Sequence, residues 1–196
     1  MTSSYQFRKT SQRIFMLRAS EAAPRLLGKL LLKKTPAGYA GGMITETEAY
    51  EQHEPASHSH KGETARNRVM FGPGGFLYVY FIYGMHYCAN VVTGKQGSGQ
   101  AVLIRSVHPL FGVEYIRNNR GRKNVAPEKL LSGPGNVCKG LDISRSDNGT
   151  DLRGDEIMIT EPLRKLKFEI RTSHRIGITK AAELPWRFTL HTEDIR

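Results

Sequence analysis

The sequence predicts an α+β fold: a single compact domain in which helices surround an antiparallel or mixed β-sheet from which one β-hairpin protrudes. Three observations support this prediction. The 196 residues are 39% hydrophobic, which suffices for one buried core. The chain contains no internal repeat, low-complexity tract or long Pro/Gly/Ser linker. Strand and helix patterns mix without the regular β-α-β rhythm of a parallel sheet. We therefore treat residues 1–196 as one domain, with residues 1–11 expected to form a flexible arm.

The first elements follow from the apolar pattern of residues 20–50. Ser20 is a candidate cap for a helix that runs to about Lys34, because four leucines between positions 26 and 31 fall on one helical face. The glycine-rich residues 38–42 then turn the chain into a strand over residues 43–50. Residues 51–68 are polar and predict an irregular loop.

Later elements are bounded by glycine and proline. Residues 76–83 and 85–92 are rich in β-branched and aromatic side chains and predict two strands that meet near Gly84. The sequence further predicts a buried strand over residues 101–107, a helix after Pro109, a second helix from about Pro127, a short helix that holds Cys138 after the loop 132–136, and a strand in which Trp186, Phe188 and Leu190 share one face.

The charge of the chain is strongly positive and unevenly distributed. There are 29 Lys and Arg against 18 Asp and Glu, a net charge of +11. Residues 66–145 contribute +8 of this, with 11 basic and three acidic side chains, whereas residues 146–196 are neutral. A field of this kind attracts a polyanion, so nucleic acid is the expected partner. A ribosome-associated or simply basic soluble protein is the alternative.

Several classes of protein are excluded by composition. No run approaches the ~20 apolar residues of a membrane span, and the N-terminus has no apolar stretch of signal-peptide length. We therefore expect a cytoplasmic, nucleoid-associated protein that is not secreted and does not enter a membrane. Two cysteines, Cys88 and Cys138, are too few for a disulfide framework or a four-cysteine metal site.

The strand over residues 43–50 carries two carboxylates. Alternation places Ile44, Glu46, Glu48 and Tyr50 on one face. Two carboxylates beside a tyrosine suit acid–base chemistry, because neighbouring like charges raise each other's pKa. An edge strand with solvated glutamates is the alternative.

The hairpin over residues 76–92 concentrates tyrosines. Its alternation places Tyr78, Tyr80 and Ile82 on one face and Tyr83 on the other. Tyrosine rings can stack on bases. At the bend, Tyr83 and Met85 project two bulky groups from a narrow ribbon, and wedges of this kind enter the DNA minor groove and fill the gap left by an extruded base. A tyrosine-rich core hairpin is the alternative.

Arg105 is the only charged residue in the apolar segment 101–107. A buried arginine is unfavourable unless it is paired, so we expect a carboxylate partner such as Glu48. A purely structural ion pair stays equally open. His53, His58 and His60 do not have the spacing of a standard metal site, and we expect no metal.

Two segments offer groups suited to phosphate. Guanidinium groups and exposed backbone amides both bind phosphate oxygens. The candidate DNA-backbone contacts are Thr64, Arg66 and Arg68 in the polar loop, and Ser132 and Gly133 in the SGPGN turn. That turn lacks the Lys-Ser/Thr ending of a nucleotide-binding phosphate loop, so no nucleotide cofactor is expected. Most glycine-rich turns bind nothing, which is the alternative.

Taken together, these motifs resemble the alkyladenine (3-methyladenine) DNA glycosylase family, in the form of a bacterial member. The resemblance spans about residues 12–191 and is specific as a set, although each motif alone is weak. The motifs are TETEAY, an HxH beside TARNR, GGFLYVYFIYGMHYCANVV, AVLIRSV, LLSGPGNVCK and RIGI.

The resemblance implies roles for individual residues. Glu48 matches the general base that activates the hydrolytic water, and Arg105 matches the arginine that helps to hold it. Ile176 matches a position whose backbone carbonyl contacts that water. The remaining matches are Tyr50, His58 and Tyr80 as stacking walls of the base pocket, with His60 as the alternative to His58; Asn90 as the residue that excludes normal guanine; and Tyr83 with Met85 as the intercalating wedge.

The implied activity is hydrolysis of the N-glycosidic bond of damaged purines in duplex DNA, the first step of base excision repair. The implied substrates are 3-methyladenine, 7-methylguanine, hypoxanthine and ethenoadenine, and the sequence does not rank them. No lysine lies between Lys34 and Lys61, so direct attack by water, inversion at the sugar carbon and no lyase step are expected. We expect a monomer without cofactors. A non-catalytic, RNA-associated binding protein is the alternative, which leaves Glu48 and Arg105 without a purpose.

Overall fold

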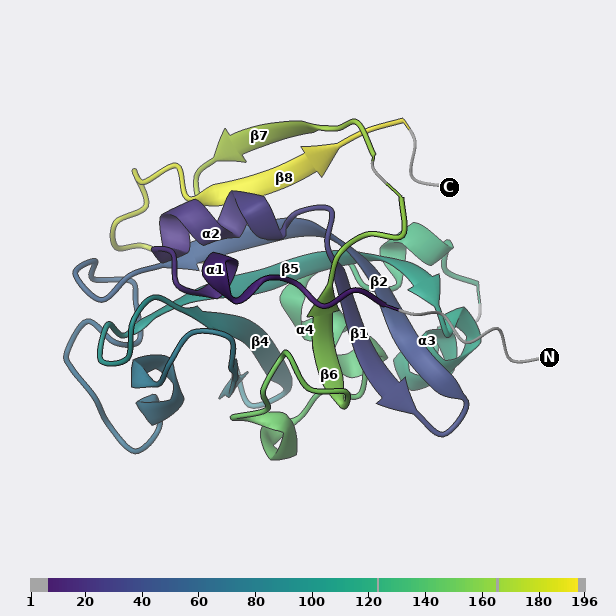
Figure 1. Ribbon diagram of the computed structural model, residues 1–196, viewed down its shortest axis with the longest axis horizontal. Coiled ribbons are helices and arrows are strands. Elements are labelled where there is room, and N and C mark those ends of the chain that lie inside the picture. The colour runs from purple at the N-terminus through teal and green to yellow at the C-terminus, as the bar shows by residue number, and fades with distance from the viewer. Residues whose placement is uncertain (1–6, 123, 165, 194–196) are drawn as a thin grey trace.

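One long strand, β2 (Gly38–Tyr50), organises the sheet in the computed structural model, which describes residues 7–122, 124–164 and 166–193. On one side, β2 pairs along most of its length with β5 (Gln100–Phe111). On its other side, the first half of β2 pairs with β1 (Leu30–Thr35) and the second half with β8 (Arg187–His191). Figure 1 shows β1 and β8 diverging from β2 in different directions. The central strand is therefore paired on both sides, by three strands in all.

The other strands extend this sheet at its edges. The order is β3-β4-β5-β2-β1-β6, and β7 joins through β8, so that eight strands form one sheet in which every pairing is antiparallel. The outer strands are β3 (Leu77–Ile82), β4 (His86–Thr93), β6 (Ile157–Thr160) and β7 (Glu169–Ser173). The predicted α+β class and the single compact domain are confirmed, as is the hairpin of β3 and β4.

Helices cover both faces of the sheet. The helix α2 (Ala19–Leu26) packs on one face, where the Thr47 hydroxyl donates to the carbonyl of Ala23 at 3.0 Å. Figure 1 shows α1 and α2 in front of β5, with α4 behind it. The other elements are α1 (Gln12–Phe15), α3 (Val113–Arg120) and α4 (Pro134–Gly140), with 3-10 turns at Arg68–Phe71, Pro127–Lys129 and Arg145–Asp147.

Close strand packing explains the glycine-rich start of β2. A Cβ at Gly41 would collide with the carbonyl of Leu31, and a Cβ at Gly42 would collide with that of His108. Only glycine lets β1 and β5 approach β2 this closely. Residues 38–42, predicted to form a turn, are therefore part of the strand, and that prediction is wrong.

The predicted helix from Ser20 to Lys34 is also wrong at both ends. Arg18, not Ser20, occupies the N-cap position, and the helix ends at Leu26, after which Gly28 adopts a φ of 80°. The leucines of β1 are fully buried between β2 and β6. An uninterrupted apolar run is compatible with a buried strand as well as with a helix, which explains the error.

Three further expectations need correction. The helix expected near Pro127 is a single 3-10 turn. The strands β6 and β7 were not predicted. Residues 7–11 are not a free arm: the amide of Thr10 donates to the carbonyl of Ile159 at 3.1 Å, and Phe7 packs edge-on against Tyr39. Residues 1–6 of the expected arm lie outside the described residues.

Candidate active site

A fully buried carboxylate, Glu48, lies at the centre of the site. It accepts three interactions from three different parts of the chain. The Tyr50 hydroxyl donates to Oε2 at 2.8 Å, and the Ile176 amide donates to Oε1 at 2.8 Å. Nη1 of Arg105 lies 3.3 Å from Oε2. A buried carboxylate needs such partners, because an unpaired buried charge is strongly unfavourable.

A backbone irregularity positions Arg105. In the β2–β5 ladder, Glu46 is opposite Ser106 and Thr47 is opposite Ile104, so Arg105 has no residue opposite it. Bulges of this kind redirect a side chain and are frequent beside active sites. At this bulge, the Arg105 guanidinium lies between Glu46 and Glu48 of β2 and pairs with both.

Arg105 belongs to a chain of alternating charges. Its Nε donates to Glu46 Oε1 at 2.9 Å, and the same oxygen accepts from Arg187 Nε at 2.6 Å. Arg187 is held in turn by Ser173 Oγ at 3.2 Å. Burial lowers the pKa of Arg105, but the charges of Glu48 and Glu46 outweigh it and raise the pKa above its ordinary value. The expectation of a carboxylate partner for Arg105 is confirmed, and it has two.

A cavity of about 480 Å³ opens directly in front of this carboxylate. The three groups that bond to Glu48 all contribute to its wall, so Glu48 lies immediately behind the lining. The volume falls within the usual range for a small-molecule site. The lining includes Tyr50, His58, Met70, Tyr78, Tyr80, Cys88, Asn90, Leu103, Arg105 and Ile176, with Gly133–Asn136 at the N-terminal end of α4.

The aromatic walls of the cavity hold one another in place. The His58 ring lies 4.4 Å from the Tyr80 ring, at 71°, and its Nδ1 is 3.2 Å from the Tyr78 hydroxyl. The Asn90 amide group donates to the Tyr78 carbonyl at 3.1 Å, which fixes its orientation at the cavity wall. His58 rather than His60 lines this cavity, because the His60 ring nitrogen is directed to the Gln52 carbonyl outside it.

Burial controls the protonation of the cavity lining. Desolvation, followed by the neighbouring Glu48 charge, raises the pKa of Tyr50 far above its ordinary value, so its hydroxyl stays a proton donor. Desolvation likewise raises the pKa of Tyr80. Burial, helped by the charge of Arg66, lowers the pKa of His58 below 6.5. The lining is therefore aromatic and mostly uncharged at neutral pH.

The tip of the β3–β4 hairpin exposes two large side chains beside the cavity. Tyr83 is 76% exposed and Met85 68% exposed. Tyr83 has a φ of 53°, which is unfavourable for a bulky residue, and Gly84 follows at 67°. Strained residues of this kind concentrate at functional sites. The structure thus places both predicted wedge residues at an exposed turn.

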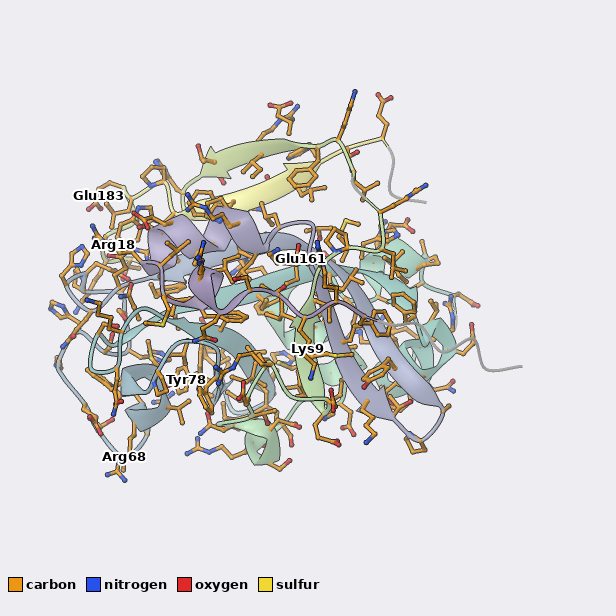
Figure 2. The ribbon with its side chains drawn as sticks, in the orientation of Figure 1. Lys9, Arg18, Arg68, Tyr78, Glu161 and Glu183 are labelled. Carbon is orange, nitrogen blue, oxygen red and sulfur yellow. The ribbon has the colours of Figure 1, made fainter. Side chains whose placement is uncertain are left out.

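The candidate phosphate contacts differ in their exposure and in the hydrogen bonds that they already make within the protein. Thr64 donates through its amide and hydroxyl to Asn67 Oδ1, while Arg66 and Arg68 are exposed. Figure 2 shows Arg68 pointing away from the fold, whereas Tyr78 lies within it; the Arg68 Nε is 3.3 Å from Glu63.

The SGPGN turn is more constrained than the sequence suggested. Ser132 is exposed and its carbonyl accepts from the Asn136 side chain, while the Gly133 amide is directed to Ser106 Oγ at 3.4 Å. This amide is therefore not an open donor, and phosphate binding by either residue stays a prediction.

Sequence reasoning missed three charged residues near the site. Arg187 follows Trp186 in a segment read only for its apolar alternation. Arg175 and Glu54 form an ion pair whose side chains are 0% and 2% exposed. Arg175 directly precedes Ile176, so the RIGI motif was a signal for it, whereas nothing in the polar loop distinguished Glu54.

The described part of the chain has no cluster of three His, Cys, Asp or Glu residues that could hold a metal ion. Among the same residues, no helix is both long enough and apolar enough to cross a membrane.

Comparison with known proteins identifies the class. A sequence model described as methylpurine-DNA glycosylase matches residues 13–194. A relative from Rhodopseudomonas palustris (strain HaA2), named "Putative 3-methyladenine DNA glycosylase", is 46% identical over 179 residues, covering 91% of this chain and 85% of the relative. Relatives with the same name from Methanoculleus marisnigri and Carboxydothermus hydrogenoformans are each 46% identical over 86% of this chain and cover 88% and 87% of their own lengths.

The fold, the carboxylate behind an aromatic cavity and these matches together define a DNA glycosylase of DNA repair. The chain belongs to the methylpurine-DNA glycosylase family. The predicted resemblance is confirmed.

His58 provides a direct test of the cavity's electrostatics. Because burial and Arg66 favour its neutral form, we expect its NMR titration to give a pKa below 6.5. A histidine in the unfolded chain has a pKa of about 6.5. Because the fold lowers the pKa of His58, the free energy of unfolding should decrease as the pH falls below that value. Arg66→Gln removes one cause and should raise the pKa. Arg68→Gln is the matched control and should leave it unchanged. An equal effect of both substitutions would contradict the assignment.

Proposed function

We propose that this protein is a monofunctional DNA glycosylase that removes alkylated or deaminated purines from duplex DNA by a water molecule activated by Glu48. The observation that carries this proposal is the buried Glu48 behind the wall of an aromatic cavity. Membership of the methylpurine-DNA glycosylase family also supports this activity.

The chemistry requires one negative charge beside the sugar. Hydrolysis of an N-glycosidic bond passes through an oxocarbenium-like state, which a carboxylate stabilises while it accepts a proton from water. An ionised carboxylate offers about four lone-pair positions. Tyr50 and Ile176 donate to two of them, and Arg105 lies 3.3 Å away as an ion-pair partner, which leaves room for a hydrogen bond from the water. Arg105 and the Ile176 carbonyl would hold the water from the cavity side.

The cavity fits a flipped purine. Tyr50, His58 and Tyr80 would stack on the base, and Asn90 would oppose the 2-amino group of normal guanine. We infer 3-methyladenine, 7-methylguanine, hypoxanthine and ethenoadenine as substrates. The first two carry a positive charge and leave readily, so a single carboxylate suffices for them.

The surface around the cavity would hold the duplex. Tyr83 and Met85 would enter the minor groove and replace the extruded base, while Thr64, Arg66, Arg68, Ser132 and Gly133 are the candidate backbone contacts. The enzyme would act as a monomer on chromosomal DNA in the nucleoid.

We further propose that the enzyme has no lyase activity. A lyase step requires an amine that forms a Schiff base with the sugar. Among the described residues, no lysine contributes to the lining of the cavity in front of Glu48.

The role of Glu48 is tested by Glu48→Gln. This substitution keeps the shape of the side chain but removes its charge, so release of methylpurines from methylated duplex DNA should fall by about 10²–10⁴-fold. DNA binding, measured by gel shift, should persist. Glu156→Gln, an exposed carboxylate paired with Lys34, is the control and should retain full activity. Unchanged release by Glu48→Gln would favour a non-catalytic role for this residue, and no release by the wild-type protein would favour a nucleic-acid-binding protein instead.

The wedge is tested by Tyr83→Ser. Stacking of a base on an aromatic ring contributes about 1–3 kcal/mol, so affinity for a duplex that carries one hypoxanthine should weaken by about 10- to 100-fold. Ile170→Ser removes a partly exposed apolar group from β7, far along the chain from the hairpin, and should have no effect. Equal affinity of the Tyr83 variant and the wild type would argue against intercalation.

A further inference from the structure

Arg175 is a buried cation that the catalytic scheme above does not use. It forms a bidentate pair with Glu54, with Nη1 2.8 Å from Oε1 and Nη2 3.1 Å from Oε2. The same guanidinium donates to the Ala49 carbonyl at 2.9 Å and to the Ala181 carbonyl at 3.0 Å. Its Cζ lies 4.7 Å from the centroid of the Tyr50 ring. One side chain therefore joins the end of β2 to two separate loops.

These contacts of Arg175 surround the groups that donate hydrogen bonds to Glu48. Two of its three partners are the Tyr50 hydroxyl and the Ile176 amide. Arg175 packs against the ring of the first and directly precedes the second in the chain. It also bonds to Ala49, the residue between Glu48 and Tyr50. Both donors thus depend on where Arg175 is held.

Glu54 is the carboxylate partner that holds Arg175 in place. Its carboxylate is almost completely buried and also accepts from the Ala56 amide at 2.8 Å. The segment that it fixes leads directly to His58, which forms another wall of the cavity. The ion pair therefore connects the Glu48 donors with the base pocket.

Stability alone is a weak reason for such a pair. Desolvation of two charges often cancels their attraction, so a buried ion pair can be replaced by apolar residues at little loss of stability. In addition, Arg175 Nε is buried and has no hydrogen-bond partner among the described residues, which is unfavourable. This arrangement is better explained by a demand for geometry, since a guanidinium offers rigid donors in several directions at once.

We propose that Arg175 and Glu54 are positioning residues for base excision, and that their ion pair keeps the Tyr50 hydroxyl and the Ile176 amide on the carboxylate of Glu48. This inference rests on the proposed function. A positioning role differs from a purely structural role in one respect, because the rate of the chemical step then depends on the ion pair even when the fold is intact.

The test separates rate from stability with a double variant. Arg175→Met alone leaves Glu54 as an uncompensated buried charge and should destabilise the fold. Adding Glu54→Gln removes that charge and should restore most of the melting temperature. Single-turnover release of methylpurines from methylated duplex DNA then gives a rate constant at saturating protein and a half-saturating protein concentration.

We expect the double variant to be at least about tenfold slower than the wild type, because small displacements of catalytic groups reduce rates strongly, whereas the half-saturating concentration should change about threefold or less. Arg175→Lys keeps the charge but not the fork and should be intermediate in rate. The matched control is Arg153→Met with Asp151→Asn, which removes a bidentate pair from outside the cavity and should turn over at the wild-type rate.

A stable double variant with the wild-type rate constant would overturn the inference, as would a loss confined to binding. If the double variant does not fold, Arg175→Lys decides: a folded protein with full rate would overturn the inference equally. Absence of release by the wild-type protein would instead contradict the proposed function, and this inference with it.

Discussion

The burial of Glu48 is the constraint on which the rest of the site depends. A carboxylate with no exposed surface requires donors from the protein, and here they come from β2, from β5 and from the segment that precedes β8. These segments are far apart in the sequence and meet only because β2 pairs with β5 on one side and β8 on the other. The pairing of the strands therefore creates the surroundings of the proposed catalytic carboxylate.

Around this carboxylate, charged side chains form two supporting groups, one of three residues and one of two. Glu46 joins Arg105 to Arg187, and Glu54 holds Arg175. Glu46 fixes Arg105, which contacts the Glu48 carboxylate directly, whereas the Glu54–Arg175 pair acts on Tyr50 and Ile176 without touching that carboxylate. The basic side chains of the chain thus include exposed cations that suit a DNA backbone, whereas the buried cations of the site are neutralised by its glutamates and add nothing to the net charge of +11.

Local pattern accounts for much of the fold and for part of the site, whereas His58, Asn90 and Ile176 were named only through the family resemblance. Alternation placed Glu48 and Tyr50 together, and the turn at Gly84 located the hairpin, because both depend on residues close in sequence. The prediction of a helix that reaches Lys34 was wrong, because a buried strand and a helix can have the same apolar composition. Arg175 was missed because its significance lies in contacts with residues more than 100 positions away.

The stereochemistry at the sugar carbon from which the base is released tests the central claim most directly. With methanol added to the reaction, activated solvent should also attack as methanol and leave a 1-O-methyl deoxyribose in the DNA. Direct attack by a solvent molecule held at Glu48 predicts the α anomer, inverted relative to the β-linked purine. Formation of the β anomer would require a covalent intermediate, and would contradict the role that this account gives to Glu48.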